Sequence, residues 1–224
     1  LQKNAVRGGY KYRPPTHSQQ GTVLLVDGTG VSYYSTGEWN RKKHKVKGRN
    51  KFVRLTLTTD AKTGLVTSVQ TSDDKGTGSG ELSQLAALLD ALPAGVYTTL
   101  IGDGAYDNKT AYNECTKHDM FLVAPPRSRA RYGNVLERNN TLSQVNKVGL
   151  VVWKKRRGYH TRSLVEATIG ALKSTLGRET RARTLAGAEA DVVARVNVYN
   201  GWRLQELTSV DEVLEQFRKD TITS

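Results

Sequence analysis

The most informative stretch of this 224-residue chain is GYHTRSLVE, from Gly158 to Glu166, together with its continuation to Lys173. At about 100° per residue, the apolar side chains of the stretch fall on one side of a helix and the polar ones on the adjoining side. The polar side chains form a stripe about 60° wide, and they are Tyr159, Arg162, Glu166 and Lys173. We therefore expect a helix that packs on a core and presents a ring, two cations and a carboxylate along one edge.

This polar stripe has two interpretations. A carboxylate held between cations suits a metal ion beside a phosphate group. Arg162 and Glu166 are also four positions apart, however, and oppositely charged pairs at that spacing usually only decorate a solvated helix face. Taken alone, the stripe favours the second interpretation.

The charge of the whole chain indicates a polyanionic partner. There are 34 Lys and Arg residues against 21 Asp and Glu, which gives a net charge of +13 and a pI near 9.9. Because each phosphate neutralised by a cation adds affinity that does not depend on sequence, this excess favours nucleic acid. A merely basic soluble protein is the alternative.

Cysteine and histidine usage restricts the kind of metal site. The single cysteine, Cys115, excludes an internal disulfide framework and a cysteine-rich zinc site, and no two of the four histidines have metal-ligand spacing. Any metal should therefore be a hard cation held by carboxylates. No apolar run reaches membrane length and no signal peptide is visible, so we expect a cytoplasmic protein without membrane contact. Because the chain begins with Leu1 instead of Met, we expect a fragment of a longer protein.

Apolar runs and turn residues predict an α/β domain over residues 21–206, with an N-terminal arm or linker over 1–20 and a C-terminal tail over 207–224. A turn is predicted at Gly28–Gly30. Strands are predicted over 22–27, 52–58, 65–70, 97–103 and 121–124, the second and third forming a hairpin. Helices are predicted over 81–92, from a cap at Asp107 or Asn108 to about Lys117, around 136–147, over 161–177 and over 187–206.

Two of the predicted strands end at an aspartate that glycine follows, in Asp27-Gly28 and Asp103-Gly104. Glycine leaves room for a metal or a substrate backbone to approach. Asp-Gly is also a common turn dipeptide, so each aspartate alone is open to a purely structural interpretation. Acids at the ends of adjacent strands, joined by Glu166 from a helix, would be able to hold divalent cations for phosphoryl transfer.

The ordered set DGTG at 27–30, DGAYD at 103–107 and Tyr-x2-Arg-x3-Glu-x6-Lys at 159–173 resembles the DDE transposases of prokaryotic insertion sequences, in the branch with that Tyr-Arg-Glu-Lys signature. The resemblance covers nearly the whole chain after about residue 20. It includes GEW at 37–39, APPR at 124–127, LERN at 136–139 and RARTLAGAEADVVARVNVYN at 181–200.

The resemblance implies an RNase H-like fold, a mixed five-stranded sheet flanked by α-helices, as in retroviral integrases. It implies that Asp27, Asp103 and Glu166 are the catalytic acids and bind two Mg²⁺ ions, with Mn²⁺ as an alternative. It also implies that Tyr159, Arg162 and Lys173 contact the transposon end. Further DNA contacts are expected at His160, Arg156, Arg157, Trp39, Lys43 and His44. For His160 and Trp39, a surface histidine and a partly buried aromatic are the respective alternatives.

The activity that the resemblance implies is cleavage at transposon ends and strand transfer into target DNA, by a homodimer or higher oligomer bound to double-stranded DNA. A structure-specific nuclease of the same fold and a degenerate or domesticated copy that only binds DNA are the alternatives. The loop over 73–78 departs from the His-Asp pair of relatives, so we expect no catalytic role there. Only 26 residues precede Asp27, so the chain is either a catalytic-core fragment or a naturally shortened copy.

Overall fold

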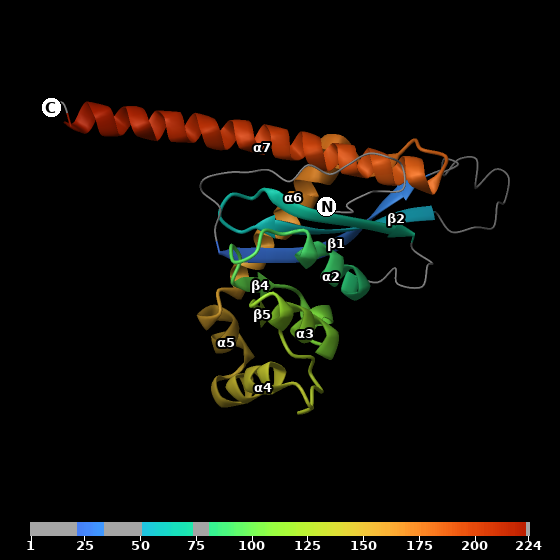
Figure 1. The fold of residues 1–224 in the computed structure, drawn as a ribbon, viewed down its shortest axis with the longest axis vertical. Helices are drawn as coiled ribbons and strands as arrows, with labels where there is room; N and C mark the ends of the chain where they lie inside the picture. The colour runs from blue at the N-terminus through green and yellow to red at the C-terminus, as the bar shows by residue number, and fades with distance from the viewer. Residues whose placement is uncertain (1–21, 34–50, 74–80, 223–224) are drawn as a thin grey trace.

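The computed structural model of the protein describes residues 22–33, 51–73 and 81–222. Its centre is a sheet in the order β3-β2-β1-β4-β5, in which β2 is antiparallel to both neighbours while β4 and β5 continue parallel to β1. This order confirms the predicted RNase H-like mixed sheet (Figure 1). The strands are Val23–Tyr33, Lys51–Asp60, Val66–Asp73, Thr99–Ile101 and Phe121–Val123 for β1 to β5. A two-residue β6, Glu179–Thr180, pairs with the far end of β1.

The predicted turn at Gly28–Gly30 is wrong, because β1 runs straight through these residues. Asp27 pairs with Leu57 and Gly30 with Arg54, so the ladder with β2 is unbroken. Asp27 therefore lies inside a long strand and not at its end. The predicted hairpin of β2 and β3 is confirmed, although β4 is only three residues long where seven were expected.

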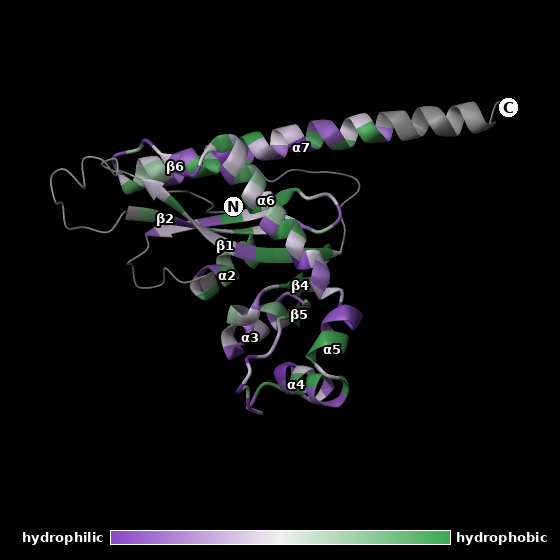
Figure 2. Cartoon of the chain, turned by 180° about the vertical axis from the view of Figure 1, so that it is seen from behind, coloured by the Kyte–Doolittle hydropathy of each residue, from purple (hydrophilic) through white to green (hydrophobic). Residues whose placement is uncertain are grey.

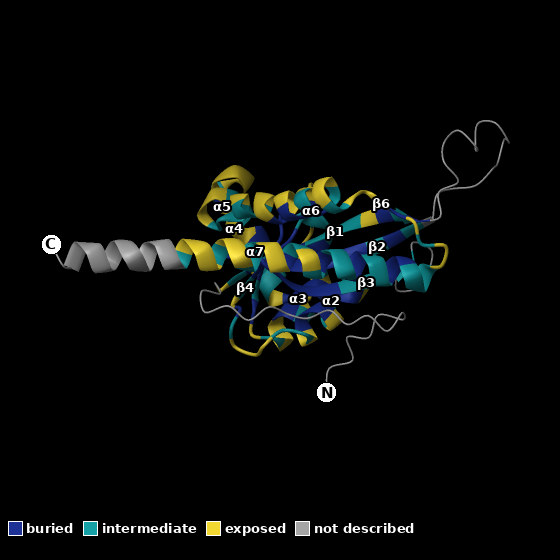
Figure 3. Cartoon of the chain, turned by 90° about the horizontal axis from the view of Figure 1, so that it is seen from above, coloured by how far each residue is buried: buried dark blue, intermediate teal, exposed yellow. Residues whose placement is uncertain are grey.

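Helices cover both faces of the sheet, and the alternation of side chains along β1 divides the core between them. Leu25 and Val31 belong to the cluster that α6 (Ser163–Leu176) and α7 (Leu185–Ile222) complete. Leu24 and Val26 belong to the opposite cluster, with α2 (Glu81–Asp90) and α3 (Lys109–Lys117). The strands are accordingly the most buried elements (Figure 3).

The helix α7 is fastened to the turn between β2 and β3. The side-chain amide of Asn200, which is 3% exposed, accepts from the Val66 N–H and donates to the Val66 carbonyl, both at 2.9 Å. Tyr199 donates to Gly64 O at 3.1 Å, and Arg203 donates to Thr63 O at 2.7 Å. Beyond these contacts α7 continues past the body of the domain (Figures 1 and 2).

Two helices lie between β5 and α6 beyond the β5 edge of the sheet (Figure 1). The first, α4 (Leu136–Val148), is the predicted helix. The second, α5 (Leu150–Arg156), was not predicted; it begins after Gly149, whose φ of +81° ends α4. The 3-10 turn η2 (Tyr159–Arg162) then leads into α6. The helix predicted over 161–177 is therefore α6, which begins at Ser163, two residues after the predicted start.

Candidate active site

The first two acids meet where β1 and β4 separate. The parallel register pairs Leu24 with Leu100 and Leu25 with Ile101. Asp27 and Asp103 each lie two residues beyond the last pair, at the same level of the sheet. The Asp27 Oδ1 atom accepts from the Gly28 N–H at 2.9 Å. The Asp103 side chain caps the 3-10 turn η1 (Gly104–Tyr106) by accepting from the Ala105 N–H at 2.8 Å.

The third acid approaches from α6, and an arginine joins it to the first. Glu166 lies in the first turn of α6. Arg162, at the end of η2, donates from Nη2 to Asp27 Oδ2 at 3.3 Å and pairs through Nη1 with Glu166 Oε1. The Glu166 side chain is 53% exposed, whereas Asp27 is 17% exposed. The open side of the site is therefore the side of Glu166.

The pKa of the Asp27 carboxyl depends on its burial and on the charges around it, including those of the other two acids. Burial is the main cause that raises the pKa of the Asp27 carboxyl; the Gly28 N–H and Arg162 oppose the rise, while Asp103 and Glu166 add to it. The pKa of Tyr159 is also raised, mainly by burial, with Arg162 opposing and the three acids contributing. The site thus gathers three carboxylates, a phenol and a guanidinium.

This donor set suits a hard divalent cation, because carboxylate oxygens are its preferred ligands. The guanidinium between Asp27 and Glu166 also demonstrates that the space accommodates positive charge. Among the described residues, no three acidic, histidine or cysteine side chains already have metal-site geometry.

Comparison with known proteins identifies the family. The profile of the transposase DDE domain matches residues 18–200. The chain belongs to the DDE transposase family. A piggyBac transposase synaptic complex with hairpin DNA matches with a TM-score of 0.49 and 8% identity, over 85% of this chain and 49% of that one. The chain thus spans about half of that transposase.

Two retroviral structures also match this DDE domain. One is a simian T-cell lymphotropic virus intasome in complex with a PP2A regulatory subunit, B56 gamma, at 14% identity and a TM-score of 0.31, covering 76% of this chain and 56% of that one. The other is the catalytic core domain of BIV integrase, at 8% identity and a TM-score of 0.29, covering 69% and 85%.

The polar stripe predicted that all four signature residues of the DDE transposase domain lie on one α-helix, and this prediction is wrong. Tyr159 and Arg162 are in η2, and only Glu166 and Lys173 are in α6. The ammonium of Lys154, in α5, lies 4.9 Å from the centroid of the Tyr159 ring, so the basic run at 154–157 begins beside the signature tyrosine. Lys173 lies further along α6, where it lines an apolar gap with Thr29 and Arg195.

The remaining predicted DNA contacts of the DDE domain are only partly described. His160 and Arg156 are exposed. Arg157 donates to Gln144 Oε1 at 2.6 Å and lies 4.7 Å from the centroid of the Phe121 ring, so it also supports the packing of α5. Trp39, Lys43 and His44 lie outside the described residues, as does the predicted arm over 1–20. Within the described chain, no helix has the length and apolar character needed to cross a membrane.

Proposed function

We propose that this domain catalyses DNA cleavage at transposon ends and strand transfer into target DNA. The observation that carries the proposal is the convergence of Asp27, Asp103 and Glu166 from two strands and a helix, together with a net charge of +13. The first reaction hydrolyses a phosphodiester and releases a 3′-hydroxyl. In the second, that hydroxyl attacks a target phosphodiester and displaces its 3′-oxygen.

The residues have separate roles in this proposal. Asp27, Asp103 and Glu166 would hold two Mg²⁺ ions, which when bound lower the pKa of water and stabilise charge on the phosphate. Tyr159, Arg162 and Lys173 would hold the backbone of the transposon end, which fixes the scissile bond in line with the attacking oxygen. Two copies of the chain would bring two ends together.

The test compares Asp27→Asn, Asp103→Asn and Glu166→Gln with Glu206→Gln, which neutralises an exposed carboxylate of α7 paired with Arg203. The substrate is a plasmid that carries the ends of the element. We expect the three variants to lose Mg²⁺-dependent cleavage and retain DNA binding, and Glu206→Gln to retain both. Cleavage by any of the three would refute the site. In a strand-transfer assay with a pre-cleaved end, failure of the wild type to join that end to target DNA would indicate a structure-specific nuclease. DNA binding by the wild type without any cleaved or joined product would indicate a degenerate copy.

A further inference from the structure

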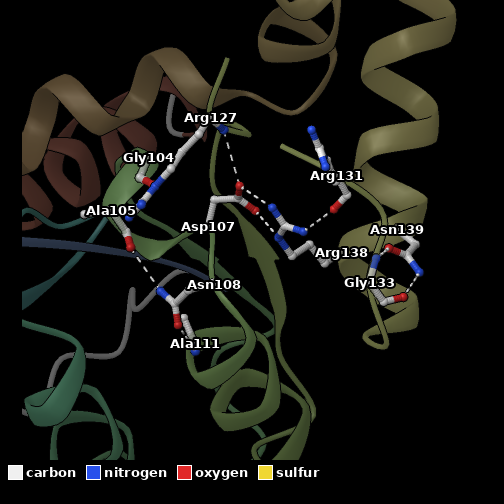
Figure 4. A network of polar contacts seen from close by, with 10 residues as sticks. All are labelled: Gly104, Ala105, Asp107, Asn108, Ala111, Arg127, Arg131, Gly133, Arg138 and Asn139. Atoms are coloured by element: carbon white, nitrogen blue, oxygen red, sulfur yellow. Dashed lines mark hydrogen bonds and ion pairs between the residues drawn. The ribbon is translucent and has the colours of Figure 1, made fainter. Parts of the chain in front are cut away.

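A buried ion pair lies at the end of η1, the 3-10 turn that the second acid begins. The side chain of Asp107 is 0% exposed, and Arg138 of α4 donates to both of its oxygens, from Nε to Oδ1 at 2.7 Å and from Nη2 to Oδ2 at 2.9 Å (Figure 4). Such paired, charge-assisted hydrogen bonds fix orientation as well as distance. The sequence predicted a cap of α3 at Asp107 or Asn108, and Asn108 has that role by accepting from the Ala111 N–H at 3.0 Å.

The same two residues hold both ends of one short segment. Asp107 Oδ2 accepts from the Arg127 N–H at 3.3 Å, and Arg138 Nη1 donates to the Arg131 carbonyl at 2.8 Å (Figure 4). We call residues 127–131 the arginine segment, because Arg127, Arg129 and Arg131 are all exposed along it. Its backbone is thus anchored while its cationic side chains face solvent.

The arginine segment lies beside the second acid. Gly104 directly follows Asp103, and the Arg127 Nε atom lies 3.5 Å from the Gly104 carbonyl oxygen. A side chain at Gly104 would meet the carbonyl oxygen of Pro125 at 3.4 Å, so the chain just before the segment packs closely on η1. The arginine segment and Asp103 are therefore both held by η1: Asp103 begins this turn, and Asp107, at its end, binds the segment.

A contribution to folding stability does not by itself explain why a buried ion pair occurs at this position. Desolvation offsets much of the attraction in a buried ion pair, and apolar residues of similar volume often replace such pairs without loss. What apolar residues cannot reproduce is the set of directed hydrogen bonds to the Arg127 N–H and the Arg131 carbonyl.

We propose that Asp107 and Arg138 are positioning residues that hold the arginine segment beside Asp103, so that Arg127 contacts the DNA backbone next to the scissile phosphate. This inference rests on the proposed function. Arg127 is the contacting residue, and the ion pair acts through it.

The experiment is a double-mutant cycle on the binding of the full chain to a short fluorescein-labelled DNA duplex. Arg127→Ala and Arg138→Lys should each weaken binding about tenfold, the size of one charge-assisted contact, and lower the salt slope by about one. The double variant should bind no more weakly than either single variant, because both changes remove the same contact. Arg203→Lys is the matched control, because Arg203 of α7 also donates to a carbonyl and a carboxylate, those of Thr63 and Glu206, at 2.7 and 2.8 Å. Its replacement should leave the affinity for DNA unchanged.

An apolar replacement separates positioning from folding. Asp107→Leu combined with Arg138→Met should keep a Tm near that of the wild type and still bind DNA as weakly as Arg127→Ala. Wild-type affinity in this variant, or additive losses in the cycle, would overturn the inference. If the wild type binds DNA but never cleaves it, a non-additive cycle still supports the anchor while the proposed function fails.

Discussion

The guanidinium of Arg162 donates from Nη2 to Asp27 Oδ2 at 3.3 Å, across 135 residues of sequence. Its other terminal nitrogen pairs with Glu166. One cation thus lies between two of the three acids and offsets their repulsion. The proposed function needs the same arginine for a DNA phosphate and the same acids for metal, so Arg162 must exchange partners when the site is loaded.

Replacing Arg162 with Ala should therefore tighten the binding of Mn²⁺ to the DNA-free protein. The pair is partly exposed, so we expect a gain of up to about fivefold, which corresponds to ~1 kcal/mol or less. Titration of Mn²⁺ followed by electron paramagnetic resonance measures the change. Arg203→Ala removes a cation elsewhere and should have no effect; weaker Mn²⁺ binding by Arg162→Ala would contradict the prediction.

Asp27→Asn should stabilise the metal-free protein at neutral pH. Burial raises the pKa of Asp27 above its usual value near 3.8, so the folded state binds more protons than the unfolded state between the two pKa values. Stability then falls as the pH rises through the folded pKa, and the neutral variant escapes this loss. Thermal unfolding in EDTA should show a higher Tm for Asp27→Asn at pH 7 and a smaller difference near pH 4. A difference that grows as the pH falls would be the wrong sign; Glu206→Gln controls for net charge.

The strands and the helices of the core were predictable because each leaves a local signal, and the three acids were candidates because each belongs to a short motif. Short apolar runs and helical periodicity indicate the elements, and the spacing from Tyr159 to Lys173 indicates the family. Pairing partners leave no such signal, which is why Gly28–Gly30 read as a turn: only the ladder to β2 makes these glycines a strand. The same holds for Asp107, which has the local appearance of a helix cap and whose partner Arg138 is 31 residues away.

Gly102→Ala should destabilise the fold by about 1–3 kcal/mol, the usual cost of overpacking. A Cβ at this position would lie 2.7 Å from Cδ2 of the buried Tyr106 ring and 3.1 Å from Val26. Gly201→Ala, in α7 with nothing within 4 Å of the new Cβ, should instead stabilise the protein by about 0.5–1 kcal/mol. Urea unfolding of both variants measures the contrast, and equal effects would show that the space at Gly102 is not restrictive.

Asn200→Ala should loosen α7 from the sheet. It removes both hydrogen bonds to Val66 and should cost about 2–3 kcal/mol, since the site is buried. Asn140→Ala, at an exposed position of α4, should stay within about 0.5 kcal/mol of the wild type. Urea unfolding of the two asparagine variants measures both free energies of unfolding. A loss for Asn200→Ala no larger than that for Asn140→Ala would show that Asn200 does not hold α7 to the sheet.

Cys115 should be inert in the folded protein and reactive after unfolding. The residue is 1% exposed, and burial raises the pKa of its thiol to about 12. At pH 8 almost no thiolate is therefore present in the native state, whereas unfolding returns the pKa to about 8.5. Iodoacetamide labelling with and without urea measures this, and equal rates in both would contradict the burial of Cys115.

Because Asp27 lies within a long strand, the face of the sheet that its carboxylate occupies depends on the number of residues that precede it in β1. Asp27 faces α6 because it shares the parity of Leu25 and Val31, while Leu24 and Val26 face α2 and α3. One residue inserted between Leu25 and Asp27 would turn the carboxylate to the wrong side of an otherwise intact sheet. Two would restore the side but carry it about 7 Å along the strand, past Asp103. Insertions and deletions in β1 should therefore abolish activity at positions where substitutions are tolerated.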